Sequence, residues 1–342
     1  MKKFWIVALA LFLYACTAGG QEREVRIGVL GLFHPKDVIV SPILGKPLTC
    51  TAGNEHFPLT QPLHLVFDRA AVKILSTGKT FSSLHCDNGQ SNATEFIVAV
   101  PQKLSRHYRG KLQIQLHGEE LQIILTMDLE VAVASVIAAE SPPSAPLEAL
   151  KAQAVASRSF LIAGKGGHKD FDFCDTTHCQ FLRQPPQNGS PAAEAAAATR
   201  GLVLAYKGEP LAAMYSASCG GRTHSLEELG IPSHGYPYFG VTCEYCRRHP
   251  EKWAARLSEA DAENLSKTEG SRLKLARKLG WKVVPGNSYS SRNENGAVIL
   301  EGSGVGHGIG LCQRGGADMA RRGASFQQIL EHYYPNTELK PY

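Results

Sequence analysis

The sequence predicts an α+β protein with a β-rich N-terminal part, a helical region that carries the candidate site, and an exposed helical insert. Residues 23–127 consist of short segments rich in Val, Ile, Leu and Phe, separated by Gly, Pro, Asn and Asp, which is typical of strands and turns. After Met127 apolar residues recur at helical spacing instead. Residues 301–335 then combine a glycine-rich loop, an amphipathic helix and a Tyr-Tyr-Pro end.

Two helices are predicted directly after the strands. The first has one apolar face and ends at the Pro-Pro pair at 142–143. The second begins near Pro146, with Ser144 as a candidate cap, and ends at Gly164. A Gly-Glu-Glu turn at 118–120 predicts a hairpin just before them, and a second strand hairpin is predicted after a short Ala-rich helix that ends at Gly201. The apolar face of the first helix is Leu129, Val133, Val136 and Ile137.

We expect three segments along the chain: a signal over residues 1–18, a β-rich region over 23–127 and a core over 128–342 with a charged helical insert at about 251–280. Lys2 and Lys3 precede an apolar run that is too short to span a bilayer, as in an export signal. Cleavage could follow Ala18, or Cys16 could be lipidated in a lipoprotein box. The expected location is the periplasm or cell envelope, with no membrane span after signal removal.

The charge balance argues against nucleic acid as a partner. The 342 residues have a formal net charge of +5 and no concentrated Lys/Arg stripe. A mild positive charge suits a partner with scattered carboxylates instead.

The cysteines suggest at least one disulfide. An exported protein can oxidise its thiols, and Cys50 and Cys86 are the two cysteines of the β-rich region. Four others lie in the C-terminal half and allow three pairings, among which the sequence does not choose. They are Cys219, Cys243, Cys246 and Cys312. Cys243-x-x-Cys246 is also a weak metal or redox signal, but a disulfide explains it as well.

Glu140 is the first candidate catalytic residue. It lies three residues beyond Ile137 and seven beyond Val133, so it extends the apolar stripe of its helix. A carboxylate there is costly unless it is paired or protonated, and burial should raise its pKa toward about 6–7. The alternative is a glutamate at the helix end that faces solvent.

Lys151 and Arg158 are the second candidate pair. They are seven residues apart and so share a face of the second helix. They could bind a ligand carboxylate or hold Glu140 in place. An ordinary solvated face is the alternative.

Two imidazoles and two thiols form a candidate zinc site. His168, Cys174, His178 and Cys179 are a sufficient ligand set for a tetrahedral ion. The aspartates at 170, 172 and 175 could receive the free ring N–H groups. A disulfide between Cys174 and Cys179 is the alternative.

Residues 214–225 bring hydrogen-bonding side chains to a Gly-Gly bend. Tyr215 and Ser216 are the candidates for ligand binding. Cys219 with His307 of the glycine-rich loop could form a nucleophile–base pair, although no strong third member is visible.

Four segments together resemble the stage II sporulation protein D family, which includes the amidase enhancers. They are MDLEVAVASVIAAESPPSAPLEALKAQAVASRSF, CDTTHCQ, MYSASCGGRTHS and GVGHGIGLCQRGGADMARRGASFQQILEHYYP, and the resemblance covers about residues 110–340. It implies a lytic transglycosylase that cuts peptidoglycan glycan strands, preferring strands stripped of stem peptides. Glu140 would be the catalytic acid, with Lys151 and Arg158 near it. Substrate-binding roles are implied for Tyr215, Ser216 and His307, and a structural zinc for His168, Cys174, His178 and Cys179.

The sequence departs from the family pattern in its aromatics. Ser141 stands where the family often has Met, and Val305 and Gln313-Arg314 stand where it often has Trp and Gln-Trp. Two functions therefore remain open. The chain is either an enzyme that forms 1,6-anhydro ends, or a non-catalytic glycan-binding activator of a peptidoglycan amidase.

Overall fold

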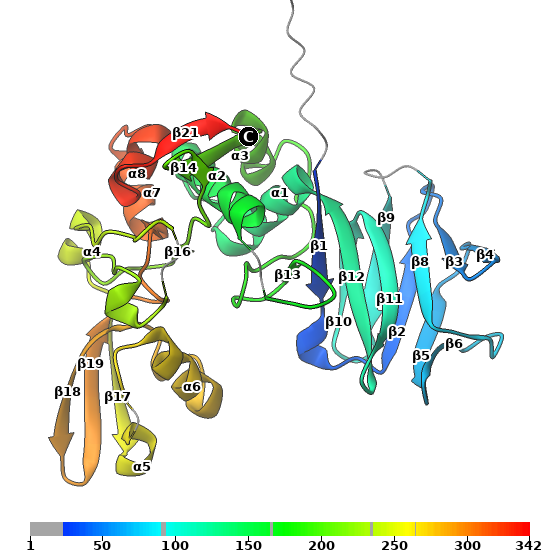
Figure 1. Ribbon diagram of the computed structural model, residues 1–342, viewed down its shortest axis with the longest axis horizontal. Coiled ribbons are helices and arrows are strands. Elements are labelled where there is room, and N and C mark those ends of the chain that lie inside the picture. The colour runs from blue at the N-terminus through cyan, green and yellow to red at the C-terminus, as the bar shows by residue number, and fades with distance from the viewer. Residues whose placement is uncertain (1–22, 90–93, 165–166, 233–234, 264) are drawn as a thin grey trace, which may run out of the picture.

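The structure, a computed structural model, describes residues 23–89, 94–164, 167–232, 235–263 and 265–342. It is an α+β fold, as predicted. Two packed β-sheets lie at one end, helices lie in the middle, and a small three-stranded sheet lies at the other end (Figure 1). The predicted signal at residues 1–18 lies outside the described residues.

The N-terminal part is a β-sandwich. Its two sheets have the strand orders β13-β1-β12-β11-β8-β3-β4 and β10-β9-β2-β5-β6-β7. Alternating residues of both sheets, such as Val40 and Phe96 on one and Leu84 and Leu112 on the other, meet in one core. The first sheet contains β1 (Glu24–Val29), β3 (Thr49–Ala52), β4 (Glu55–Pro58), β8 (Ser83–Asp87), β11 (Lys111–His117), β12 (Glu120–Asp128) and β13 (Phe173–Cys174). The second contains β2 (Asp37–Pro42), β5 (Leu63–Asp68), β6 (Ala71–Ile74), β7 (Thr80–Phe81), β9 (Glu95–Val100) and β10 (Leu104–Arg109).

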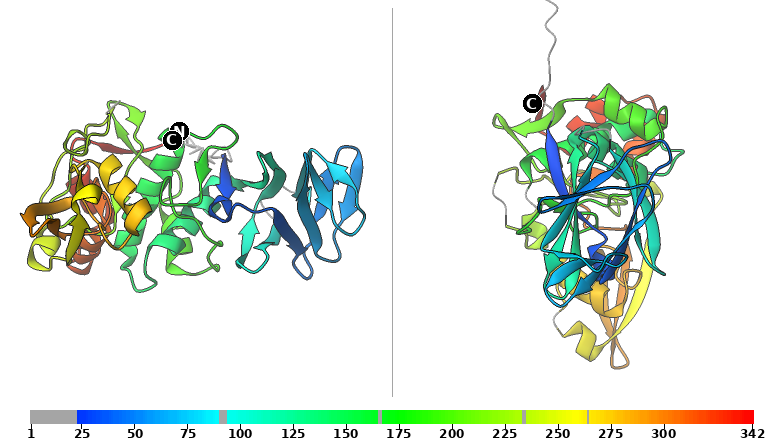
Figure 2. Two further views of the ribbon diagram at one scale, coloured as in Figure 1. Left: turned by 90° about the horizontal axis from the view of Figure 1, so that it is seen from below. Right: turned by 90° about the vertical axis from the view of Figure 1, so that its right-hand side faces the viewer.

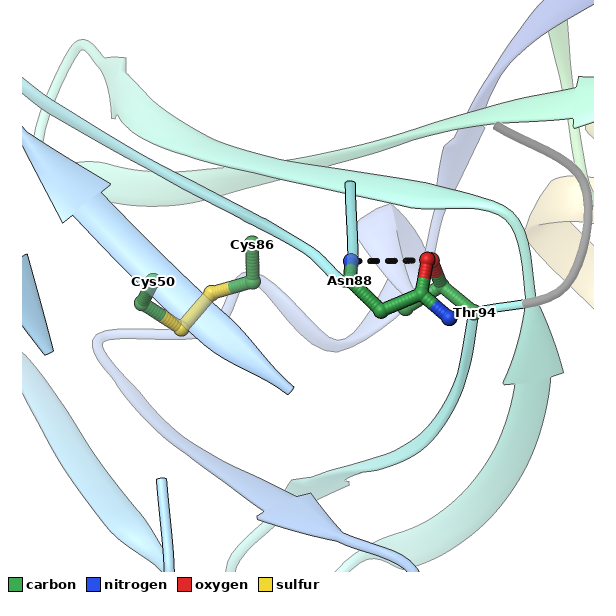
Figure 3. Close-up of a disulfide and its surroundings, with 4 residues drawn as sticks. All are labelled: Cys50, Cys86, Asn88 and Thr94. Atoms are coloured by element: carbon green, nitrogen blue, oxygen red, sulfur yellow. Dashed lines mark hydrogen bonds between the residues drawn. A yellow bond between two sulfur atoms is a disulfide. The ribbon is translucent and has the colours of Figure 1, made fainter. Parts of the chain in front are cut away.

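The predicted disulfide between Cys50 and Cys86 is present and joins β3 to β8 (Figure 3). Just beyond β8, the backbone N–H of Asn88 donates to Thr94 Oγ1 at 3.1 Å. The predicted hairpin turn at Gly118 is also confirmed, because β11 and β12 pair up to His117 and Glu120.

The helices begin where β12 ends. α1 (Leu129–Glu140) follows β12 without a loop, and the Asp128 carboxylate caps it by accepting from two backbone N–H groups. Pro146 occupies the N-cap position of α2 (Leu147–Ala163) and no side chain caps this end, so the expectation that Ser144 caps the helix was wrong. α2 ends at Gly164, as predicted. α3 (Pro191–Ala198) is the Ala-rich helix.

α2 lies between the two larger cores of the molecule (Figures 1 and 2). Leu150 and Ala154 of this helix face the sandwich core, whereas Val155 and Ala156 face the C-terminal core. The C-terminal core is built from α7 (Gln313–Arg321), α8 (Phe326–Tyr333), β14 (Leu202–Tyr206), β15 (Glu209–Pro210), β16 (Tyr215–Ser216), β20 (Leu311–Cys312), β21 (Glu338–Pro341) and α4 (Glu244–Arg248). The short 3-10 segments are Gly31–Phe33 and Glu227–Leu229. None of the helices in the described ranges is long and apolar enough to cross a bilayer.

Two predictions for the C-terminal half need correction. The insert is not purely helical, because Lys252–Ser258 forms β17, which pairs with β19 (Ala297–Ser303) beside β18 (Ser288–Glu294). Among the described residues of the insert, the helical segments are α5 (Glu259–Ala262) and α6 (Glu269–Leu279). The last predicted helix is two helices, α7 and α8, separated by Gly323 at a φ of +91°.

Candidate active site around Glu140

Glu140 is the last residue of α1, and its carboxyl group is turned into the protein. Its Oε1 accepts a hydrogen bond from the backbone N–H of Phe181 at 2.6 Å. The Tyr215 hydroxyl forms a second hydrogen bond with the same carboxyl. The solvent-facing alternative for this residue is therefore not what the structure shows.

Burial raises the pKa of Glu140 from its usual 4.5 to about 7. The hydrogen bonds from Tyr215 and Phe181 act in the opposite direction but are the smaller effects. A carboxyl group with this pKa is protonated in a large fraction of molecules near neutral pH, so it can donate a proton.

Uncharged side chains of α2 and α7 complete the surroundings of Glu140. Ser141 donates to Gln153 Oε1 at 2.5 Å, and Ser157 donates to the Tyr215 hydroxyl at 3.3 Å. Gln313 Nε2 donates to the Glu140 backbone carbonyl at 3.2 Å. The sequence analysis did not identify Gln153 and Ser157, and it named Ser141 and Gln313 only as departures from the family pattern. The available signal was that Gln153 and Ser157 are polar residues four apart on an apolar helix.

Arg158 does not lie beside Glu140, contrary to the prediction. Its side chain is fully buried, and its guanidinium binds both carboxylate oxygens of Glu130, at 2.8 and 2.6 Å. It also donates to the backbone carbonyls of Ala196 and Leu202. Glu130 precedes Glu140 by ten residues on α1, which separates the two by roughly 15 Å. Arg158 therefore joins α1, α2 and α3.

Lys151 is not placed against Glu140 either. Its ammonium group pairs with Glu148 one turn earlier, at 2.7 Å. The other oxygen of Glu148 accepts from the Phe326 backbone N–H at the start of α8. Lys151 therefore belongs to the contact between α2 and α8, and the face of α2 toward Glu140 carries Gln153 and Ser157 instead.

His307 fixes the strand that carries Tyr215. Its Nδ1 accepts from the Ile309 backbone N–H at 3.0 Å, and the ring also hydrogen-bonds the Tyr215 backbone. Burial lowers the pKa of His307 to about 4, so the imidazole is neutral at physiological pH. With both of these bonds made, His307 is not arranged as the base of Cys219.

Ser216 follows Tyr215 in β16 and is 6% exposed. Its Oγ is buried without a hydrogen-bond partner among the described residues. Buried hydroxyl groups are usually satisfied, so this one is available to a ligand or a water molecule.

The four predicted zinc ligands converge. The ligand atoms of His168, Cys174, His178 and Cys179 all lie within 4.8 Å of one another, and both thiols are free. The nitrogen–sulfur distances are 3.4 Å for His168 with Cys179, and 3.7 and 3.5 Å for His178 with Cys174 and Cys179. Tetrahedral zinc bonds of ordinary length give about 3.6 Å for such a pair, so the donor set fits the ion.

The aspartates around this cluster do not support the ligand histidines as expected. They bind other groups and tie residues 170–175 to the sandwich. The partners are His117 for Asp170 at 3.7 Å, the Arg26 backbone N–H for Asp172, and Arg106 with the Leu30 backbone N–H for Asp175.

Comparison with known proteins gives a consistent result. Residues 117–206 match the family model described as stage II sporulation protein, and this range includes Glu140 and the His/Cys cluster. The matched range runs from β12 through α1, α2, the following loop and α3 to β14.

Three relatives match a larger share of the chain than the family model does. An uncharacterized protein of Brachyspira hyodysenteriae is 28% identical over 69% of this chain and 73% of its own. The stage II sporulation protein D of Bacillus amyloliquefaciens is 24% identical over 62% of this chain and 74% of its own. The amidase enhancer of Bacillus subtilis is 27% identical over 60% of this chain but only 40% of its own length. Over these ranges the chain is similar to the stage II sporulation protein family model and to relatives named stage II sporulation protein D and amidase enhancer.

Proposed function

We propose that this protein is a peptidoglycan lytic transglycosylase that cleaves the bond between N-acetylmuramic acid and N-acetylglucosamine. The observation that carries the proposal is the Glu140 carboxyl group, held by Phe181 and Tyr215 with a pKa of about 7. The resemblance to a family of cell-wall proteins supplies the substrate class, with strands stripped of stem peptides as the preferred form.

One carboxyl group suffices for this reaction. Protonated Glu140 donates to the glycosidic oxygen as the bond from that oxygen to C1 of the muramic sugar breaks. The C6 hydroxyl of the same sugar then bonds to C1, and its proton returns to the Glu140 carboxylate. The products are a 1,6-anhydro end and a free hydroxyl on the other fragment. Ordinary glycosidases, which hydrolyse the bond with water, use a second carboxylate instead.

The neutral surroundings of Glu140 favour its role as an acid. A cation within a few ångströms would stabilise the carboxylate and lower its pKa. The structure has Gln153 and Ser157 on the nearby face of α2, while Arg158 and Lys151 pair with Glu130 and Glu148. In this proposal Glu140 can donate a proton because Arg158 and Lys151 are paired with other carboxylates and do not lower its pKa.

We also propose that His168, Cys174, His178 and Cys179 bind a structural zinc ion. Four protein ligands leave no open position for water, so zinc here would supply no catalytic step. Phe181, whose N–H binds Glu140, comes two residues after Cys179. The cluster would therefore fix the backbone that orients the acid.

The test is the formation of anhydro-muramic ends on purified, peptide-stripped glycan strands, measured by mass spectrometry. Glu140→Gln should keep both hydrogen bonds to the side chain and abolish product. The matched control is Glu119→Gln, which removes the same charge from an exposed hairpin turn and should leave the rate unchanged. Wild-type rates in Glu140→Gln would remove this residue from the role.

A second candidate function is activation of a peptidoglycan amidase. The relative named amidase enhancer favours it. The two functions separate when the pure protein is incubated with glycan strands in the presence or absence of an amidase. An activator yields no anhydro ends alone but increases peptide release by the amidase, whereas the enzyme makes anhydro ends without a partner.

The proposed substrate lies outside the cytoplasm, so we propose export through residues 1–18 to the periplasm or cell envelope. The disulfide between Cys50 and Cys86 supports an oxidising compartment. Fractionation of cells that express the full chain tests this location, and the mass of the mature protein distinguishes cleavage after Ala18 from lipidation at Cys16.

A further inference from the structure

Four cysteines from separate parts of the C-terminal half meet in the core. Cys219 follows β16, Cys243 and Cys246 lie at the start of α4, and Cys312 ends β20. All four are buried and free, and their sulfur atoms lie within 4.8 Å of one another. The sequence left these residues as candidates for disulfides, with Cys243-x-x-Cys246 also a weak metal or redox signal. The structure shows one cluster rather than two pairs.

We propose that these four thiols bind a second zinc ion, in a site separate from the His/Cys cluster. The distance between the sulfurs of Cys246 and Cys312 is 3.6 Å. Four zinc–sulfur bonds of ordinary length in a tetrahedron give about 3.8 Å for each sulfur pair. Two disulfides require only that sulfurs approach in pairs, whereas a tetrahedral ion requires all four to converge, as they do here.

Hydrogen-bond donors surround the sulfur atoms. The Gly315 backbone N–H donates to the sulfur of Cys312 at 3.4 Å, and the Tyr333 hydroxyl donates to that of Cys243 at 3.4 Å. The Ser218 hydroxyl lies 3.6 Å from the sulfur of Cys246. Donors of this kind stabilise negative charge on metal-bound thiolates and orient them.

The packing around the sulfurs also explains one glycine. A Cβ at Gly315 would lie 1.9 Å from the Tyr333 hydroxyl and 2.5 Å from the sulfur of Cys243. Any larger residue at this position would displace the Tyr333 hydroxyl and the Cys243 sulfur. The absence of a side chain at Gly315 therefore allows the first turn of α7 to pack against the cluster.

The proposed site holds together the strands that carry the candidate active site. β16 pairs with β20, with Tyr215 opposite Leu311 and Ser216 opposite Cys312. Gln313, the residue after Cys312, donates to the Glu140 backbone carbonyl. The ion would therefore hold β16 and β20 in place, and with them the Tyr215 hydroxyl. A role of the ion in positioning the active site rests on the proposed function. The metal site itself does not depend on that function.

Metal content per chain tests the site without any assay of glycan cleavage. Wild-type protein purified without chelators should contain about two zinc ions per chain, one for each set of four ligands. Cys174→Ser/Cys179→Ser removes the other cluster and should retain about one. Cys243→Ser/Cys246→Ser should lose one ion and retain the other. The matched control is Cys50→Ser/Cys86→Ser, which removes two cysteines and should leave the zinc content unchanged.

Peptide mapping of the wild-type protein provides a second measurement that needs no variant to fold. The four cysteines should resist alkylation in the native protein and react after a chelator is added. Disulfides among these four in protein as isolated would overturn the proposal. A folded Cys174→Ser/Cys179→Ser variant that contains no metal would also overturn it. Each of these results leaves the role of Glu140 to be decided by product analysis.

Discussion

At the scale of single residues, Glu140 shows how burial without a nearby cation prepares a carboxyl group to donate a proton. Its neighbours are a backbone N–H, a tyrosine hydroxyl and amide and hydroxyl side chains, all neutral. Burial raises the pKa to about 7, and the Tyr215 hydrogen bond limits that rise because it stabilises the carboxylate. Activity that depends on the protonated form should therefore decline tenfold per pH unit above about pH 7.

Tyr215→Phe should move this decline to higher pH. Loss of one hydrogen bond to the carboxylate raises the pKa of Glu140 further, by roughly 0.5 to 1 unit. The measurement is the pH profile of kcat/KM for anhydro-product formation. Tyr289→Phe is the control, because that hydroxyl donates to the Ser266 carbonyl in the small three-stranded sheet region. A lower rate with an unmoved pH profile would mean that Tyr215 binds substrate rather than tuning Glu140.

Arg158 should act on stability rather than on substrate. Arg158→Met leaves the carboxylate of Glu130 largely buried and unpaired, which should lower the free energy of unfolding by about 3–5 kcal/mol. Arg158→Lys keeps the charge but loses the bidentate hydrogen bonds to the Glu130 carboxylate, so it should also be destabilising. Lys151→Met should change stability by less than about 1 kcal/mol, since its partner Glu148 is partly exposed. Urea unfolding measures all three, and an Arg158→Lys variant that loses activity at full stability would contradict this assignment.

At the scale of elements, the glycine-rich loop is explained by close contact between two backbone segments. Gly304 has a φ of +86°, and a Cβ there would lie 2.6 Å from both the Gly220 nitrogen and the Ser218 carbonyl oxygen. The same two segments are joined by the bridge between Ser218 and Val305. The loop therefore packs directly on the segment that follows β16, and there is no room for side chains between them.

Gly304→Ala should consequently destabilise the protein far more than a glycine with a similar backbone but open surroundings. The control is Gly296→Ala in the β18–β19 turn, with a φ of +70° and no heavy atom within 4 Å of an added Cβ. The control should lose about 1 kcal/mol from the left-handed backbone alone. Gly304→Ala should lose roughly 1–3 kcal/mol more, because backbone atoms must shift. If urea unfolding gives equal losses of stability for the two variants, the backbone contact between Gly304 and residues 218–220 is not rigid.

At the scale of the whole molecule, local patterns predicted the elements better than their partners. The alternating strands of residues 23–127, the apolar face of α1, the end of α2 at Gly164 and the Cys50–Cys86 disulfide all follow from nearby residues. The sequence predicted a helix at β17 because β17 pairs with β19, whose residues lie between 39 positions (Ser258 with Ala297) and 51 positions (Lys252 with Ser303) later, and no local pattern reports such a partner.

The same limit applies to the candidate site. The position of Glu140 on an apolar stripe predicted that its carboxyl group is buried. The spacing of the two His and two Cys residues predicted that these four side chains meet. The partner of Arg158 depended on which face of α2 meets α1, and helical spacing alone left that open. The cluster of four cysteines is assembled from segments up to 93 residues apart, so only the tertiary fold reveals that the sulfurs meet.

The Cys50–Cys86 disulfide lies at the edge of the first sheet that is remote from the candidate site. The Cys50–Cys86 bond joins β3 to β8, and strands β11 and β12 lie between β8 and β1, the neighbour of β13. Cys50→Ala/Cys86→Ala opens a loop with a sequence separation of 36 residues and should lower the free energy of unfolding by about 2–4 kcal/mol. The pH profile of product formation at 25 °C should not change, since Phe181, Tyr215 and Gln313 are all held elsewhere. Guanidinium unfolding and the pH profile of the same sample test both statements. A shifted pH profile would show that the edge of the sandwich that carries the disulfide is coupled to Glu140.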